Sequence, residues 1–377
     1  MEETRNTEDW TKRKKHGHGD WDGHGDAQVH GEGHRRGGRG GKGWKEASDK
    51  HFFEVENLVV EYTSGGEVVK AVNGVSFTLD KGETLGLVGE TGAGKTTIAK
   101  SILRILPDPP AKVKGGNIWY NGRDILSAPE RKMLSIRGDK IAMIFQDPMT
   151  ALNPTMSVGK QIQENIQLHT DCTRKEAEDR MGEMLEMVGI PRVRAVEFPH
   201  QFSGGMKQRV VIAMALACSP EIILADEPTT ALDVTIQAQV LDMMKDLREK
   251  MQTAMILITH DLGVVAEMCD KVAVIYAGEI VESGSLEQIF HRPSHPYTNG
   301  LFGAIPSIDS EDESKRLKAI PGLPPDPTHL PTGCKFAPRC EFATDACRQA
   351  VPANVEMEPG HFVLCNRVTA GTGKEDA

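Results

Sequence analysis

The sequence predicts an α/β fold in which short buried strands end in polar loops that carry chemistry. Three segments support this prediction. The apolar run Thr84–Val88 enters a glycine-rich loop followed by a helical pattern. The apolar runs 221–225 and 254–258 end in two acidic residues and in a histidine, respectively. Short apolar runs bounded by such polar ends are typical of buried strands.

The loop after the first strand has the pattern of a phosphate-binding loop. Its glycines let backbone N–H groups converge on phosphate oxygens, and the following helix adds its positive dipole end. Lys95 would reach the β- and γ-phosphates of a nucleotide, and Thr96 would ligate Mg²⁺. The helix is expected to end at Pro107. A glycine-rich turn that binds nothing is the alternative. The candidate residues are Gly89, Glu90, Thr91, Gly92, Ala93, Gly94, Lys95, Thr96 and Thr97.

Two adjacent carboxylates follow the second apolar run. We expect the strand to continue through both, so that Asp226 and Glu227 point to opposite sides of an extended chain. Asp226 would hold Mg²⁺ through water, and Glu227 would act on an attacking water as general base. A solvated strand end is the simpler interpretation, but uncompensated charge at the end of an apolar run is costly.

A second candidate anion site precedes the helical segment 210–218. Ser203 is a plausible N-cap, and Gly204 and Gly205 allow close approach to an anion, followed by Met206. A chain that already has a phosphate loop needs a reason for a second anion-binding segment. The reason would be a nucleotide site shared by two chains, in which each chain supplies its phosphate loop to one site and its second segment to the other. The segment resembles the signature sequence of ABC ATPases, with Phe for the usual Leu and Met where Gln is commoner.

Further family elements follow the same order. Gln146 resembles the Q-loop glutamine, a further Mg²⁺ ligand, and His260 resembles the switch histidine. Asp233, in Ala231-Leu232-Asp233, resembles the D-loop aspartate. Tyr62 lies in the region of the aromatic residue that stacks on adenine, although it could equally be a strand residue packed in the core.

The resemblance covers residues 52–290 and implies a P-loop NTPase of the ABC cassette type. Such a cassette has a RecA-like core, an antiparallel β subdomain and a helical subdomain, here at about 147–205. The family pairs two cassettes head to tail, so ATP would be held by Lys95 and Thr96 of one chain and by the signature of the other. Glu227, His260 and Gln146 would then be the catalytic residues.

Composition and charge limit the location of the chain. A net charge of −10 argues against a nucleic-acid binder. The longest apolar run, 210–218, is far shorter than the ~20 residues of a membrane helix. The first ten residues have no apolar core, so no secretory signal is expected. We therefore expect a peripheral protein at the cytoplasmic face of the cell membrane, linked to it by partner subunits.

Residues 1–50 differ from the rest in being rich in glycine, histidine and charge, and we expect them to form a disordered tail. Its histidines could chelate a transition metal or could simply be solvated. These are His16, His18, His24, His30 and His34.

The segment 291–377 is expected to form a small cysteine-rich extension. Cys334, Cys340, Cys347 and Cys365 lack the short spacing of zinc ribbons, and a disulfide is disfavoured in a cytosolic chain. Four thiolates suit an iron–sulfur cluster, with zinc and free thiols as alternatives. Neighbouring cations could offset the negative charge of a cluster, namely Lys335, Arg339 and Arg348.

These cysteines, the sequence His295-Pro296-Tyr297-Thr298 and a proline run resemble the C-terminal region of peptide-importer ATPases of the dipeptide/oligopeptide family. Some members of that family bind a [4Fe-4S] cluster through matching cysteines. The resemblance implies an ATPase that uses ATP and Mg²⁺ to drive import of di- and oligopeptides. It also implies its partners: two membrane-spanning permeases, a second ABC ATPase that forms a heterodimer with it, and an extracytoplasmic solute-binding protein.

Three other functions stay open. Nickel import by a related transporter has slight support from the histidine-rich tail. A soluble ABC ATPase of DNA repair or translation would commonly carry two cassettes, whereas this chain carries one. A regulatory module that holds ATP without hydrolysing it would not need both Glu227 and His260.

Overall fold

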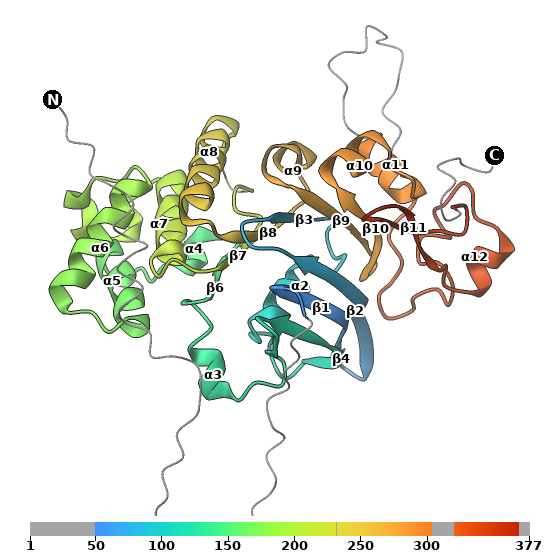
Figure 1. The fold of residues 1–377 in the computed structure, drawn as a ribbon, viewed down its shortest axis with the longest axis horizontal. Helices are drawn as coiled ribbons and strands as arrows, with labels where there is room; N and C mark the ends of the chain where they lie inside the picture. The colour runs from blue at the N-terminus through green and yellow to red at the C-terminus, as the bar shows by residue number, and fades with distance from the viewer. Residues whose placement is uncertain (1–49, 231, 304–319, 369–377) are drawn as a thin grey trace, which may run out of the picture.

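The protein is described by a computed structural model over residues 50–230, 232–303 and 320–368, drawn as a ribbon in Figure 1. The segment 1–49, with the five histidines of the expected tail, lies outside the described residues. The interpretation of that segment as a disordered tail therefore stays a prediction.

Eight strands form the central sheet of the described chain. In sequence order they are β3 (Thr84–Val88), β6 (Ile141–Ile144), β7 (Ile222–Asp226), β8 (Ala254–Thr259), β9 (Lys271–Tyr276), β10 (Glu279–Ser285), β11 (Asn354–Glu358) and β12 (His361–Leu364). Their order in the sheet is β11-β12-β10-β9-β3-β8-β7-β6, and the strands from β9 to β6 run parallel. β3, β7 and β8 are buried along their whole length, as their largely apolar sequences predict. The expected α/β fold is thus confirmed.

A second, antiparallel sheet packs against the phosphate-loop side of the first. It has the order β2-β1-β4-β5 and consists of β1 (Phe53–Ser64), β2 (Glu67–Leu79), β4 (Ala111–Tyr120) and β5 (Arg123–Asp124). The helix that follows β3 is α2 (Lys95–Ile102). Apolar residues of both sheets and of α2 share one buried core. This core fixes the position of the loop between β3 and α2.

The end of α2 differs from the prediction. The helix ends at Ile102, whereas Pro107 was expected to end it. Arg104 has a φ of 52° in the left-handed region, and its guanidinium donates a hydrogen bond to the carbonyl of Ala128. Ile105 is exposed instead of completing the apolar helix face. A tertiary contact of Arg104 therefore accompanies the turn that ends the helix, ahead of the proline.

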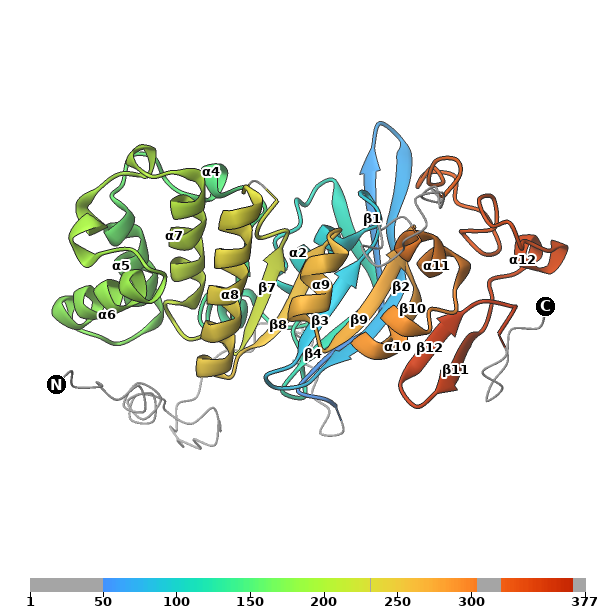
Figure 2. The same ribbon diagram turned by 90° about the horizontal axis from the view of Figure 1, so that it is seen from above.

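The chain between β6 and β7, all of which the structure describes, forms helices and no strand. Its helices lie at one end of the molecule (Figure 2). The last of them is capped by Ser203, as predicted, and begins earlier than residue 210. In order they are α4 (Pro148–Ala151), α5 (Val158–His169), α6 (Arg174–Met187), the 3₁₀ helices η2 (Arg192–Val196) and η3 (Pro199–Gln201), and α7 (Gly204–Leu216).

The remaining helices cover the sheets and the extension. They are α3 (Glu130–Leu134), α8 (Val234–Met251), α9 (Leu262–Met268), α10 (Leu286–His291), α11 (Pro296–Phe302) and α12 (Asp345–Gln349). Within the described ranges, no helix is both long and apolar enough to cross a membrane.

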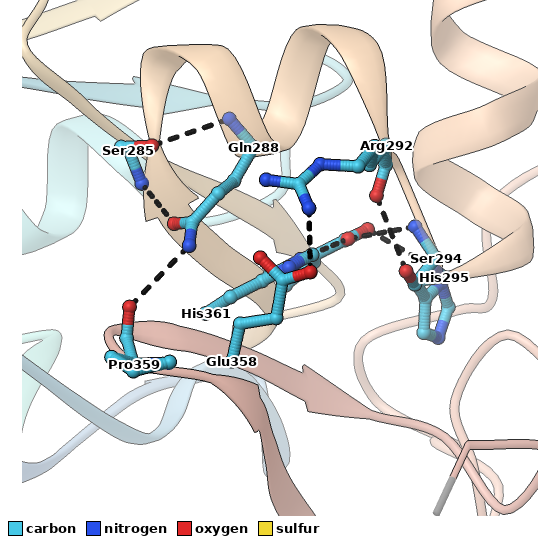
Figure 3. A network of polar contacts seen from close by, with 9 residues as sticks. Ser285, Gln288, Arg292, Ser294, His295, Glu358, Pro359 and His361 are labelled. Carbon is cyan, nitrogen blue, oxygen red and sulfur yellow. Dashed lines mark hydrogen bonds and ion pairs between the residues drawn. The ribbon is translucent and has the colours of Figure 1, made fainter. Parts of the chain in front are cut away.

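The C-terminal extension is joined to the cassette through the central sheet. β12 pairs antiparallel with β10, with Glu282 opposite Val363. The fully buried Glu282 accepts hydrogen bonds from the N–H groups of Ser294 and His295, and it lies 2.8 Å from Nε2 of the buried His361. Figure 3 shows this network between the two segments. The segments on the two sides of the predicted boundary at residue 290 therefore contribute strands to the same sheet.

Candidate active site

The phosphate loop lies between β3 and α2, where the sequence predicts it. Close backbone approaches require glycine at two positions. A Cβ atom on Gly89 would lie 2.1 Å from the carbonyl oxygen of Ile275, and one on Gly94 would lie 2.3 Å from that of Ala71. Gly94 also has a φ of 102° and is the N-cap of α2. Packing against neighbouring strands therefore shapes a loop at the start of a helix, a position that suits a bound anion.

Of the other small residues of the loop, some are exposed and one is buried. Thr91 and Gly92 are exposed. Ala93 is buried, and its carbonyl accepts a hydrogen bond from the N–H of Gly278 at 3.0 Å. The loop is thus anchored on the turn after β9 while its tip stays accessible.

Lys95 lies inside the loop at the first turn of α2. Its ammonium donates hydrogen bonds to the carbonyl oxygens of Gly89 at 2.6 Å and of Glu90 at 3.0 Å. Burial lowers the pKa of Lys95, and the carboxylates of Glu227, Asp226 and Glu90 oppose this effect. The charged ammonium is therefore held between the loop and the acidic strand end, the position that a phosphate-binding lysine needs.

Thr96 and Asp226 meet beside this lysine. The Thr96 hydroxyl donates a hydrogen bond to Oδ1 of Asp226 at 3.0 Å, which joins α2 to the end of β7. Burial raises the pKa of Asp226, and the hydrogen bond from Thr96 opposes the shift. A hydroxyl and a carboxylate placed together are hard oxygen donors of the kind that Mg²⁺ prefers. Both are among the predicted Mg²⁺ ligands.

The three predicted catalytic residues come together next to this pair. Gln146 donates a hydrogen bond from Nε2 to Oε2 of Glu227 at 2.8 Å. Nδ1 of His260 lies 3.1 Å from the other carboxylate oxygen of Glu227. Thr230, which the sequence analysis did not identify, donates to Oε2 of Glu227 at 3.0 Å. Its position three residues after Glu227 was the available signal.

The backbone at Glu227 differs from the prediction. We expected an extended residue whose side chain points away from that of Asp226 by strand alternation, and this was wrong. β7 ends at Asp226, and Glu227 has a φ of 47° in the left-handed region. Its N–H still donates to the carbonyl of Ile258 on β8 at 2.8 Å. A turn held by the neighbouring strand, and not the alternation of a strand, therefore aims this carboxylate.

Tyr62 was interpreted either as the aromatic residue near the nucleotide or as a strand residue packed in the core, and its position agrees with part of each interpretation. It lies on β1 and packs against the core beneath α2. Its hydroxyl is 3.3 Å from Oγ1 of Thr97, the last predicted residue of the phosphate loop. The tyrosine is therefore a strand residue that contacts the start of α2.

The signature residues are not brought to the phosphate loop. Ser203 caps α7 by accepting a hydrogen bond from the N–H of Met206 at 3.4 Å. Gly204 has open space around it, whereas a Cβ on Gly205 would lie 2.5 Å from a methyl of Ile236 on α8. Both views place α8 and β7 between α7 and α2 (Figures 1 and 2). These residues therefore form a separate surface.

The D-loop aspartate has a structural role at the start of α8. Asp233 is the N-cap of this helix and accepts a hydrogen bond from the N–H of Ile236 at 3.0 Å. Its neighbour Ala231 lies outside the described residues.

The extension contacts the phosphate loop directly, which the sequence analysis missed. Arg339 forms a two-pronged ion pair with the carboxylate of Glu90, with N–O distances of 2.9 and 3.1 Å. Arg339 was expected to offset the charge of a cysteine cluster; its ion-pair partner is in the loop, and the role beside a cluster stays a prediction. Lys335 and Arg348 also have other partners: Lys335 donates to the carbonyl of Pro331 and Arg348 pairs with Asp345.

The four cysteines of the extension line one small cavity. Burial raises the pKa of Cys334 and Cys340, and it raises that of Cys365 to about 11. Burial also opposes the thiolate of Cys347, but hydrogen bonds from Thr344 outweigh this and lower its pKa. No group of three or more His, Cys, Asp or Glu side chains in the described chain is arranged to hold a metal ion. The four thiols predicted to bind a [4Fe-4S] cluster thus line the same cavity, but they are not arranged to coordinate a metal.

Comparison with known proteins identifies two matching families. Residues 72–230 match the family described as ABC transporter. Residues 281–347 match the family described as oligopeptide/dipeptide transporter, C-terminal region.

Three similar proteins cover most of the chain. The chain is 51% identical over 314 residues to the oligopeptide transport ATP-binding protein OppD of Bacillus subtilis (strain 168), which covers 83% of this chain and 87% of that protein. It is 49% identical over 315 residues to the dipeptide transport ATP-binding protein DppD of the same strain, covering 83% and 93%. It is 47% identical over 316 residues to OppD of Salmonella typhimurium, again covering 83% and 93%.

Solved structures support the same fold. The ATP-binding cassette MJ0796, in a dimeric post-hydrolysis state bound to ADP and Pi, is similar with a TM-score of 0.57 and 28% identity, covering 62% of this chain and 98% of that one. The protein cbiO1 from Clostridium perfringens, part of the ABC transporter complex cbiONQ, is similar with a TM-score of 0.55 and 25% identity, covering 65% and 92%.

Proposed function

The chain belongs to the ATP-binding proteins of the ABC transporter family, and from this premise we propose that it is the ATPase subunit of an importer of di- and oligopeptides. The observation that carries the proposal is the convergence of Gln146 and His260 on Glu227, beside the Thr96–Asp226 pair, in a chain that also has the peptide-transporter C-terminal region. That region favours peptide transport over nickel transport and over a soluble ABC ATPase.

The proposed mechanism assigns binding and chemistry to neighbouring groups. Lys95 and the N–H groups at the start of α2 would hold the phosphates of ATP, and Thr96, Asp226 and Gln146 would hold its Mg²⁺. Glu227 accepts a hydrogen bond from the attacking water and takes its proton as the γ-phosphate leaves. His260 positions Glu227. Phosphoryl transfer depends mainly on such positioning and on charge stabilisation.

The proposed site is completed by a second cassette. Ser203, which is exposed, and Gly205 lie at the start of α7, and α8 and β7 separate this helix from α2, which begins at Lys95 (Figure 2). In a head-to-tail pair, the equivalent residues of the partner cassette would close over the phosphates, and the D-loop at Asp233 would lie at the same junction. The N–H groups at the start of a helix suit the γ-phosphate. ATP binding would thereby drive closure, and hydrolysis would release it.

The proposed assembly follows the peptide-importer pattern. It contains two membrane-spanning permeases, a second ABC ATPase and an extracytoplasmic solute-binding protein, with this chain at the cytoplasmic face of the membrane. The helical segment from α4 to η3 exposes Val193 and Val196, which are apolar residues available to a permease.

Transport assays with the assembled importer test this function. The chain and its neighbouring permeases, second ATPase and binding protein are reconstituted in proteoliposomes. We expect ATP-dependent uptake of labelled oligopeptides, and we expect Lys95→Ala in this chain to reduce it strongly. Uptake of Ni²⁺ without peptide uptake, or an active ATPase that never co-purifies with permeases, would contradict the proposal.

We also propose that the four cysteine thiols hold a [4Fe-4S] cluster. Their shared cavity supports this, since such clusters take four thiolates. When bound, the cluster would link segments of the extension that the sequence separates. Anaerobically purified protein should show a visible absorption band, with iron and sulfide in equal amounts. Stoichiometric zinc, or protein that folds fully without metal, would contradict it.

A further inference from the structure

One residue of the phosphate loop, Glu90, is held by the C-terminal extension from two sides. Its backbone N–H donates a hydrogen bond to the hydroxyl of Tyr297 at 3.0 Å. Its carboxylate receives both prongs of the Arg339 guanidinium. These partners follow Glu90 by 207 and 249 residues. Two distant segments of the chain thus meet at the second position of the loop.

The arginine is itself fixed before it reaches the loop. Its side chain is only 6% exposed, and its Nε donates a hydrogen bond to the carbonyl of Pro321 at 2.9 Å. The guanidinium also lies over the ring of Tyr276, 5.7 Å from its centroid, and donates to the hydroxyl of that tyrosine. A planar guanidinium held by stacking and a backbone acceptor loses little further freedom when it pairs with a carboxylate.

An aromatic cluster holds the tyrosines in place. The ring centroids of Tyr276 and Tyr297 are 4.6 Å apart, and that of Phe336 lies 5.2 Å from the first and 5.4 Å from the second. Tyr297 and Tyr276 are almost completely buried. The cluster therefore forms a rigid support beneath the phosphate loop, built from β9, α11 and the cysteine-rich segment.

The need for this support follows from charge. ATP brings several negative charges into a loop that already contains a carboxylate, and a carboxylate near phosphates repels them unless a cation compensates it. Glu90 is close enough to act electrostatically on the ammonium of Lys95. Lys95 is already shared with Asp226 and Glu227, so it does not neutralise Glu90 by itself.

We propose that Arg339 is a positioning residue for nucleotide binding, which neutralises Glu90 and, together with Tyr297, holds the phosphate loop open for ATP. The C-terminal extension thereby sets the affinity of the cassette for ATP. This inference rests on the proposed nucleotide site and adds a residue outside the cassette to it. The partners of Arg339 are Glu90, Tyr276 and Pro321, and none of them is among the residues that contact the side chain of Glu227, so we expect Arg339 to act on binding and not on the chemical step.

Nucleotide titrations of the full-length protein test the proposal. Binding of a fluorescent ATP analogue with Mg²⁺ is measured for the wild type and for Arg339→Ala. We expect Arg339→Ala to weaken binding about tenfold, and to raise KM for ATP with kcat changed less than about twofold, because it removes binding made equally in the ground and transition states. Arg339→Lys keeps the positive charge but cannot pair with the carboxylate through two parallel hydrogen bonds. Its affinity for ATP should lie between those of the wild type and Arg339→Ala.

A double variant separates charge compensation from a purely structural role. In Glu90→Gln/Arg339→Ala the uncompensated carboxylate is absent, so affinity should recover most of the loss seen in Arg339→Ala. A role limited to holding the extension in place would give no recovery, because both variants lack the ion pair. Arg348→Ala is the matched control, since Arg348 lies in the same extension, is 60% exposed and pairs with Asp345. It should bind ATP like the wild type.

The outcomes that overturn the proposal are distinct from a failure of the nucleotide site. Wild-type affinity in Arg339→Ala would remove Arg339 from nucleotide binding. Equal weakening in Arg339→Ala and in the double variant, with a lowered unfolding temperature in both, would reduce the ion pair to a structural contact. A wild-type protein that does not bind ATP would instead overturn the proposed function.

Discussion

Oε1 of Glu227 lies 3.1 Å from Nδ1 of His260, and this contact acts on the charge of the proposed base. Burial opposes the ionised form of Glu227, but hydrogen bonds from His260 and Thr230 outweigh it and lower the pKa of the carboxyl group. The carboxylate is therefore ionised at neutral pH. Gln146, on the other oxygen, restricts its orientation.

The first prediction concerns Glu227→Gln. The amide keeps the size of the side chain but cannot accept the proton of the attacking water, so we expect steady-state ATP turnover to fall about 100-fold or more. ATP binding should persist and should trap the closed cassette pair. ATPase assays and size-exclusion chromatography with ATP measure the two effects. Near-normal turnover would remove Glu227 from the catalytic role.

The second prediction concerns the pH dependence of His260→Ala. Without the hydrogen bond from His260, the pKa of Glu227 should rise. A base is active above its pKa, so the acidic limb of the kcat profile should move to higher pH. Profiles of the wild type and the variant, measured across acidic and neutral pH, give the shift directly. A variant with lower kcat but an unmoved acidic limb would show that His260 acts elsewhere.

The third prediction concerns Mg²⁺ and Thr96. Replacing the hydroxyl by a methyl group in Thr96→Val removes one oxygen donor beside Asp226. We expect the Mg²⁺ concentration for half-maximal activity to rise roughly tenfold or more. Thr96→Ser keeps the hydroxyl and serves as the matched control, with a Mg²⁺ requirement close to that of the wild type. Equal Mg²⁺ curves for the two variants would contradict a ligand role for Thr96.

The parts of the site that the sequence predicts are those that short segments determine. The loop from Gly89 to Gly94 is flanked by its own strand, β3, and its own helix, α2. Ser203 caps α7 as expected, because an N-cap depends on a few consecutive residues. Such local sequence patterns can be recognised without knowledge of the fold.

The missed features depend on contacts between distant segments. The left-handed turn at Glu227 is fixed by a hydrogen bond to Ile258 on a neighbouring strand, and no local pattern indicates it. The pair formed by Glu90 and Arg339 joins two segments that are 249 residues apart in the sequence. β12 joins the cassette sheet next to β10 for the same reason. These contacts exist only after the extension has packed on the cassette.

His295 provides a pH-sensitive contact between cassette and extension. Its Nδ1 accepts a hydrogen bond from the N–H of Tyr297 at 3.0 Å and caps α11, and its own N–H donates to Glu282. The residue is 1% exposed. Burial lowers the pKa of His295 from its ordinary value of 6.5 to about 4, although the charge of Glu282 opposes this. The folded chain therefore favours the neutral imidazole.

The last prediction is a loss of stability in mild acid that depends on His295. Between pH 6.5 and 4 the unfolded chain binds a proton that the folded chain does not, so this group lowers stability as pH falls, by about 2 kcal/mol at pH 5. His295→Asn keeps a side chain that caps helices but does not titrate. Its unfolding temperature should therefore fall less between neutral and acidic pH than that of the wild type. His329→Asn, at an exposed position of the extension, should keep the wild-type pH dependence. Equal acid sensitivity of His295→Asn and the wild type would show that other groups control this transition.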